Sequence, residues 1–301
     1  MTLATLGLLL AAPADALQLK MRFDGKPQPR EASKPITLEL AVLDDEGAPA
    51  SVLLPHHEKT MHLVAVPEDL SELVHVHPHD RGEGRFSLRL RDRKGPRDLD
   101  NDQAVHGFAK PGTWWVFAEV SDFPGQTVVL QDRVRVPGKV AARALPSPMK
   151  WAGDAATASI DVDSATMAIW TRSRRSDGTL ILTCKLVNPR GEQILGFRPW
   201  LGMSAHGVLL GKNSDGPIFR HLHPEGAHAG HGRVHHPAPP SAEANPHGHH
   251  GAHHETHDPG APGDWTFILG PDEAVPSGTY RFWLQARRDT GLVTLPFTLS
   301  L

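Results

Sequence analysis

The feature that most constrains the fold of this chain is an internal repeat. The segment Ile36–Gly47 has the same pattern of apolar strand and polar turn as the segment Leu180–Gly191. The offset that aligns the two final glycines also aligns His62 with His206, without a gap. Because self-similarity at a fixed offset is the signature of repeated structural units, the chain is predicted to contain two copies of one domain.

Three further landmarks recur in the same order in both copies. They are Val74–Pro78 with Arg220–Pro224, Gly84–Leu88 with Gly263–Phe267, and Pro111–Ala118 with Pro276–Trp283. The first of these pairs reads x-His-x-His-Pro in both copies. A shared order of landmarks supports a duplication rather than a chance likeness between two segments.

Each copy consists of short apolar runs, alternating or β-branched, separated by Gly, Pro, Asp and Asn turns, with little helical periodicity. The predicted strands are 17–23, 35–43, 61–67, 73–77, 85–90, 113–120 and 127–136 in the first copy, and 157–171, 179–187, 205–210, 218–222, 264–269, 278–286 and 292–300 in the second. About seven strands per copy is typical of a β-sandwich. The predicted fold class is therefore all-β, with two tandem immunoglobulin-like or cupredoxin-like β-sandwich domains.

The N-terminal segment has features of an export signal. The apolar run Leu3–Ala12 is too short to span a bilayer as a helix, and it is followed by the small-x-small pattern Ala14-Asp-Ala16 that signal peptidases cut. A first β-strand or a frayed terminus is the alternative interpretation of this segment. A cleaved signal predicts a periplasmic or extracellular protein. No later segment is apolar enough for a membrane span, so none is predicted in the mature chain.

The predicted domain boundaries follow from the repeat and from proline-rich composition. They are a signal peptide at 1–16, a first β-sandwich at 17–137, a linker at 138–154, and a second β-sandwich at 155–301 that contains a His-rich, disordered insertion at 225–263.

Histidine is the unusual component of the composition, with 20 residues against one Cys and one Tyr. A single cysteine excludes an intrachain disulfide and any Cys-x-x-Cys chemistry, and Cys184 lies inside a predicted strand, where core packing is its expected role. The 31 basic and 34 acidic residues nearly balance, which gives no basis for sequence-independent binding to nucleic acid. The histidines are therefore the side chains to examine for function.

Three histidines of the first copy are predicted to cluster on one β-hairpin. His62 opens a strand, and the chain returns through His75 and His77. A hairpin centred on Glu68 and Asp69 would place His62 opposite His75. Because side chains alternate along a strand and cross-strand partners share a face, all three imidazoles are expected on one side of the sheet.

Such a cluster is within reach of one metal ion. Imidazole suits Zn, Cu, Ni and Fe, and the thioether of the neighbouring Met61 favours copper. The second copy offers His206, His221 and His223, with Met203 nearby. Two alternatives remain open, since histidines of this pattern also line solvated sheet faces or bond turn carbonyls.

The segment Met61–Pro78 resembles bacterial secreted proteins that share a Met-His-apolar run, an Asp-Leu-Ser turn and a His-x-His-Pro close. Proteins of this kind are described as heavy-metal- or copper-associated periplasmic proteins with immunoglobulin-like folds. The resemblance covers His62–Phe117 well and His206–Trp283 more loosely, and the segment Gly211–Gly216 replaces the Asp-Leu-Ser turn in the second copy. It implies copper binding by immunoglobulin-like domains in the periplasm.

The insertion in the second copy carries half of all the histidines. They are His228, His231, His235, His236, His247, His249, His250, His253, His254 and His257. A flexible tract of this composition is predicted to bind divalent transition metals at many sites with moderate affinity. A tolerated polar insertion and a pH-responsive tract are the alternatives. The other four histidines, His56, His57, His79 and His106, are scattered through the first copy.

The leading hypothesis is a periplasmic or secreted protein that binds, buffers or delivers a transition metal. Copper is the expected ion, with zinc or nickel as alternatives, and the expected partners are metal ions together with a metal transporter or another envelope protein. The second hypothesis is a non-catalytic, immunoglobulin-like interaction module of the cell envelope whose histidines are incidental. A metalloenzyme is disfavoured, because no carboxylate repeats beside the histidines as a general base.

Overall fold

The computed structural model describes residues 17–31, 35–50, 52–90, 108, 110–123, 126–141, 144–162, 165–225 and 261–301. The chain divides into two compact units, Met1–Leu145 and Pro146–Leu301, and this division falls within the predicted linker. The predicted signal peptide at 1–16 and residues 226–260 of the insertion lie outside the described residues. Within the described part of the chain, no helix has the length and apolar character needed to span a membrane.

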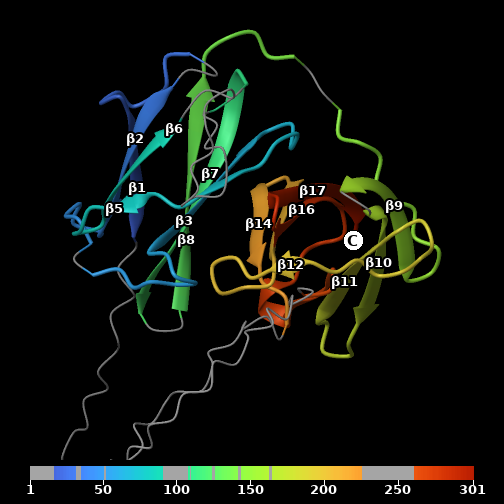
Figure 1. Ribbon diagram of the computed structural model, residues 1–301. Helices are drawn as coiled ribbons and strands as arrows, with labels where there is room; N and C mark the ends of the chain where they lie inside the picture. The colour runs from blue at the N-terminus through green and yellow to red at the C-terminus, as the bar shows by residue number, and fades with distance from the viewer. Residues whose placement is uncertain are drawn as a thin grey trace, which may run out of the picture. The chain divides into compact units, whose positions relative to one another are not determined.

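The first unit is a sandwich of two antiparallel sheets (Figure 1). Its strands are β1 (Gln18–Phe23), β2 (Ile36–Leu43), β3 (Met61–Pro67), β4 (Val74–Val76), β5 (His79–Asp80), β6 (Arg85–Leu90), β7 (Gly112–Phe123) and β8 (Gln126–Val136). One sheet has the order β1-β2-β6-β5 and the other the order β4-β3-β7-β8. With β4 counted as an added strand beside β3, this is the strand order of an immunoglobulin-like sandwich, whose seven strands form sheets ABED and CFG.

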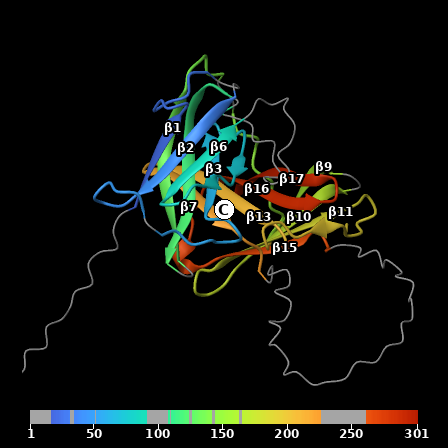
Figure 2. The same cartoon turned by 60° about the vertical axis from the view of Figure 1, so that its left-hand side comes forward.

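The second unit repeats this plan with small additions (Figure 2). Its strands are β9 (Ala155–Val162), β10 (Ala165–Arg174), β11 (Leu180–Val187), β12 (Phe197–Arg198), β13 (His206–Asn213), β14 (Gly216–Leu222), β15 (Asp264–Leu269), β16 (Thr279–Arg288) and β17 (Gly291–Ser300). One sheet has the order β9-β10-β11-β15. The other has the order β12-β16-β13-β14, with β17 paired to β16.

Strand pairing confirms the all-β fold built from an internal repeat. Strands β1, β2, β3, β4, β6, β7 and β8 of the first unit correspond to β10, β11, β13, β14, β15, β16 and β17 of the second. The registers also agree. His62 lies opposite Glu119 and His206 opposite Gln285, which are equivalent pairs of the β3–β7 and β13–β16 ladders. The two copies therefore present equivalent residues at equivalent places on their sheets.

Each unit has its own core between its two sheets. In the second unit the buried ring of Trp170 on β10 lies 5.0 Å from that of Phe282 and 5.1 Å from that of Phe297, which joins one sheet to the other. Cys184 is fully buried in the same core, where burial raises the pKa of its thiol. Its predicted role in core packing is confirmed.

A side chain near the start of the sixth repeated strand hydrogen-bonds to the backbone four residues earlier in both units. The Tyr280 hydroxyl donates to the Pro276 carbonyl at 2.6 Å, and the Trp114 indole nitrogen donates to the Lys110 carbonyl at 3.0 Å. The first of these contacts is the tyrosine corner of immunoglobulin-like sandwiches. In the first unit tryptophan performs the same task.

Three details differ from the predicted strands. The run predicted at 157–171 is two strands, β9 and β10. Strands β5 and β12 were not predicted, because two residues are too few to show a period of two.

Candidate metal centres

The first unit brings together the three histidines that the repeat singled out. His62 lies at the start of β3, His75 in β4, and His77 directly after β4. Their ring centroids are 4.7 Å apart for His62 and His77, 5.0 Å for His75 and His77, and 5.7 Å for His62 and His75. All three side chains are at most 3% exposed. A buried group of three imidazoles is thus present at the end of this hairpin.

The predicted pairing of His62 with His75 is wrong. Val64 is the residue opposite His75 in the β3–β4 ladder, so His62 lies level with His77. The hairpin is centred one residue later than predicted, between Asp69 and Leu70, and Leu70 has a positive φ of 52°. Because this moves the pairing by two residues, and side chains alternate with a period of two, the three histidines still share a face.

Hydrogen bonding determines which ring nitrogen of His62 carries its proton. Nε2 of His62 lies 2.9 Å from the His56 carbonyl oxygen, which can only accept, so Nε2 is the donor. In the neutral ring Nδ1 then holds the lone pair, 3.2 Å from Nε2 of His77. Two nitrogens bound to one tetrahedral ion lie about 3.3 Å apart, given bonds of 2.0–2.1 Å. An imidazole held by a carbonyl through its other nitrogen is the usual arrangement of a metal ligand.

Burial keeps this imidazole neutral. The pKa of His62 is lowered from 6.5 to about 3, mainly by desolvation on burial and secondly by the proximity of His75. The hydrogen bond from His62 to the His56 carbonyl raises this pKa and opposes the shift. A neutral ring retains the lone pair that a metal ion requires.

The same pKa predicts a loss of stability in acid. The unfolded chain protonates His62 near pH 6.5 and the folded chain only near pH 3, so protons favour unfolding between these values. In the presence of EDTA, the free energy of unfolding is expected to fall by up to about 1.4 kcal/mol per pH unit below pH 6. Urea denaturation at a series of pH values measures this slope. His62→Gln removes one group that takes up a proton on unfolding, so the pH dependence of the free energy of unfolding should become less steep. An unchanged slope would contradict the lowered pKa of His62.

The second unit brings together its own three histidines in the same arrangement. His206 opens β13, His221 lies in β14, and His223 follows β14. The ring centroids are 4.9 Å apart for His206 and His223, 4.6 Å for His221 and His223, and 5.5 Å for His206 and His221. Ring nitrogens of all three lie within 4.8 Å of one another. Each separation is within a few tenths of an ångström of its counterpart in the first unit.

The hairpin that carries this second cluster has a different turn but the same register. Gly207 pairs with Leu222, so His206 lies level with His223, as His62 does with His77. The turn is closed by the Asn213 side chain, whose Oδ1 accepts from the backbone nitrogens of Asp215 and Gly216 at 2.9 and 3.0 Å. The longer hairpin adds residues at the turn and leaves the histidine end unchanged.

The two methionines are placed differently from each other. Met61 belongs to the sandwich core together with Leu63, on the face of β3 opposite His62. Neighbouring residues of a strand point to opposite faces, so the sequence adjacency that suggested Met61 as a ligand keeps its thioether away from the cluster. Met203 is buried in a tight turn three residues before His206.

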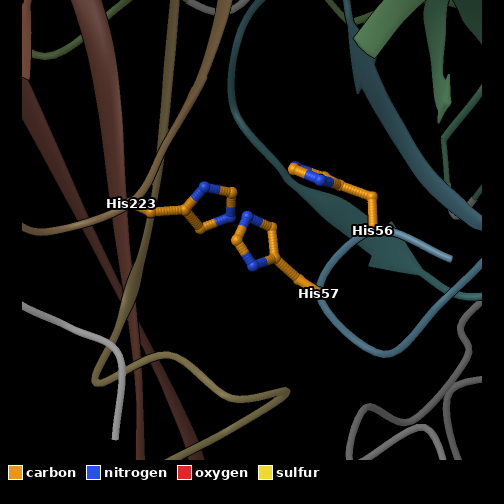
Figure 3. A group of neighbouring side chains, drawn as sticks. All are labelled: His56, His57 and His223. Carbon is orange, nitrogen blue, oxygen red and sulfur yellow. The ribbon is translucent and has the colours of Figure 1, made fainter. Parts of the chain in front are cut away.

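Two histidines that sequence reasoning left as scattered lie beside the first cluster. His56 and His57 belong to a turn that ends at Lys59 and is closed by backbone hydrogen bonds of 2.8 and 3.2 Å. Figure 3 shows their imidazoles next to each other, with ring centroids 3.9 Å apart. The centroids lie 6.2 and 6.4 Å from that of His62. His223, also labelled in Figure 3, belongs to the second unit.

Glu119 was also missed. It lies opposite His62 in the β3–β7 ladder and is 8% exposed, and its charge raises the pKa of His62, against the larger effect of burial. The repeat alignment of Pro111–Ala118 with Pro276–Trp283, extended by one residue, pairs Glu119 with Leu284. It gives no signal for Glu119, and only the strand registers make Gln285 its equivalent. His106 and the ten histidines of the insertion lie outside the described residues.

Comparison with known proteins gives a family likeness for the first unit. No curated protein matches this chain. The crystal structure of S. aureus TarS 217–571 is 12% identical, with 70% of this chain and 52% of that chain covered and a TM-score of 0.22. The crystal structure of S. aureus TarS is 12% identical, with 69% of this chain and 33% of that chain covered and a TM-score of 0.21. The native conformation of E. coli alpha-2-macroglobulin is 11% identical, with 94% of this chain and 16% of that chain covered and a TM-score of 0.22.

This chain therefore spans about half or less of each of these proteins, and likeness at this level carries no argument about its activity. Residues 14–138, which lie within the first unit, match the family described as "Domain of unknown function (DUF8832)".

Proposed function

We propose that this protein binds transition-metal ions at one three-histidine site in each repeat, and that it buffers or delivers them in the periplasm or outside the cell without catalysing a reaction. Copper is the ion proposed first, with zinc or nickel as alternatives. The observation that supports the proposal is the recurrence of the same cluster, on equivalent strands, in the same register and with closely similar ring separations.

Packing alone gives no reason for this recurrence. A duplicated sandwich keeps its inward-facing residues because they form the core, as Leu63 and Leu209 do. The clustered histidines lie on the opposite face of the same strands, because His62 and His206 alternate with those core residues. Three imidazoles converging from one hairpin form a ligand set that suits copper, zinc and nickel.

The His-rich insertion fits the same role. It begins shortly after His223, so metal ions collected by its ten histidines would be held close along the chain to the second site. A flexible chelator of high capacity beside a defined site is the composition expected of a buffer or a delivery protein. A metal transporter or another envelope protein is the proposed recipient.

Metal stoichiometry tests the proposal. In a full-length variant whose ten insertion histidines are replaced by asparagine, two metal ions in total are expected to bind when Zn²⁺ and Cu⁺ are both supplied, because the two folded sites remain. Isothermal titration and elemental analysis after dialysis measure the number. Binding only in the unmodified chain would assign metal binding to the insertion, and binding in neither chain would favour the interaction module.

A further inference from the structure

We infer that the two repeats select metal ions of different charge, the first site taking a divalent ion with the help of Glu119 and the second taking monovalent copper. The inference rests on the proposed function. It comes from comparing what surrounds the two clusters, which share their three imidazoles and differ in the neighbouring side chains at every equivalent position described below.

The first difference is a buried charge. Glu119 in β7 is the cross-strand partner of His62, and Gln285 in β16 is the cross-strand partner of His206. Cross-strand partners share a face of the sheet, so each side chain lies on the histidine side. Both are buried, and the Gln285 amide donates to the Thr294 hydroxyl at 3.0 Å. The first site thus has a carboxylate where the second has a neutral amide.

The second difference lies in a turn whose backbone is the same in both repeats. His56 and Lys59 are joined by backbone hydrogen bonds of 2.8 and 3.2 Å, and Trp200 and Met203 by bonds of 2.8 and 3.1 Å. The two middle residues have positive φ in each case, 48° and 65° in the first turn and 53° and 72° in the second. The two turns are separated along the chain by the same number of residues as His62 and His206, so they are equivalent.

Because the backbone of this turn is the same in both repeats, its side chains can be compared position by position. The first turn carries His56 and His57, and the second carries Trp200 and Leu201 in their places. The Trp200 ring lies 4.6 Å from that of His206, and Met203 replaces a lysine. The first cluster therefore has two imidazoles and a carboxylate as neighbours. The second has an indole, and a buried thioether lies in the turn three residues before His206.

These surroundings favour different ions for electrostatic reasons. A buried carboxylate attracts a divalent ion about twice as strongly as a monovalent one, and nitrogen and oxygen ligands together suit Zn²⁺ and Cu²⁺. The desolvation cost of an ion rises with its charge, so a site without a counter-charge accepts a monovalent ion more readily. Thioether sulfur is a soft ligand that selects Cu⁺, and an indole face attracts cations.

Two isosteric substitutions, made in the full-length variant without insertion histidines, separate the sites. Glu119→Gln is expected to weaken Zn²⁺ binding at the first site about 10- to 100-fold, because the ion loses its counter-charge, while Cu⁺ binding at the second site is unchanged. Gln285→Glu is expected to strengthen Zn²⁺ binding at the second site. Titrations with Zn²⁺, and with Cu⁺ against a competing chelator in the absence of oxygen, measure both affinities.

A methionine substitution supplies the converse test. Met203→Leu keeps the apolar volume and is expected to weaken Cu⁺ binding while Zn²⁺ binding at the first site stays unchanged. Circular dichroism and thermal unfolding establish that each variant is folded. If both sites bind metal and Glu119→Gln changes the Zn²⁺ affinity by less than about twofold, the inference is wrong and the proposed function stands, since an outer-shell partner would have a larger effect. If neither site binds either ion, the proposed function itself is wrong.

Discussion

Replacement of His77 by asparagine is expected to remove one of two bound metal ions from the chain that lacks the insertion histidines. His77 supplies the nitrogen that lies 3.2 Å from Nδ1 of His62, so its loss leaves two imidazoles, one fewer than the three protein ligands of open metal sites. Loss of a direct ligand should exceed the 10- to 100-fold effect typical of an outer-shell partner, which places the loss in affinity above about 100-fold. Equilibrium dialysis followed by elemental analysis measures the stoichiometry.

His79 provides the matched control for this substitution. It lies two residues further along, in β5 of the opposite sheet, and its side chain is exposed. His79→Asn makes the same chemical change and is expected to leave both ions bound. Retention of two ions by the His77 variant would show that the first cluster is not a metal site, whatever the insertion binds.

The largest effect on stability is expected for Trp170→Ala. The side chain is fully buried, and its ring packs edge-to-face against Phe282 and Phe297 of the opposite sheet. Removing a buried aromatic ring costs its transfer free energy and leaves a cavity, so the free energy of unfolding of the second unit should fall by about 3–5 kcal/mol. Urea denaturation followed by circular dichroism measures this change.

A substitution of an exposed apolar residue in the same unit serves as the comparison. The Leu195 side chain is 48% exposed, and Leu195→Ala is expected to alter the free energy of unfolding by no more than about 0.5 kcal/mol. A similar small loss for Trp170→Ala would mean that this ring does not join the two sheets.

Local patterns were sufficient to predict most strands of both repeats. Strand β3 and strand β15, for example, have the predicted bounds within one residue, because apolar runs between turn residues are short-range signals. The clustering of His62, His75 and His77 was also predictable, since it depends on alternation within one hairpin. The exact partner of His62 was not, because a turn such as Pro67–Ser71 permits more than one register.

Side chains contributed by distant strands could not be predicted in the same way. Glu119 reaches His62 only because β7 pairs with β3, and nothing in the local sequence of either strand specifies that pairing. His56 and His57 are close to His62 in the sequence, but their approach to it depends on the turn that ends at Lys59, which local periodicity does not reveal. Met61 was predicted as a ligand because it is next to His62 in the sequence, but neighbouring residues of a strand lie on opposite faces of the sheet.

By itself the sequence determined that this chain is a duplicated all-β protein with three repeated histidines in each copy, because periodicity and repetition are written along the chain. Only the tertiary structure decided the surroundings of each cluster, because strand pairing over long separations brings Glu119 to one and Gln285 to the other. A long-range pairing is selected by the packing of the whole sandwich, so its consequences for a buried site are a property of the folded unit.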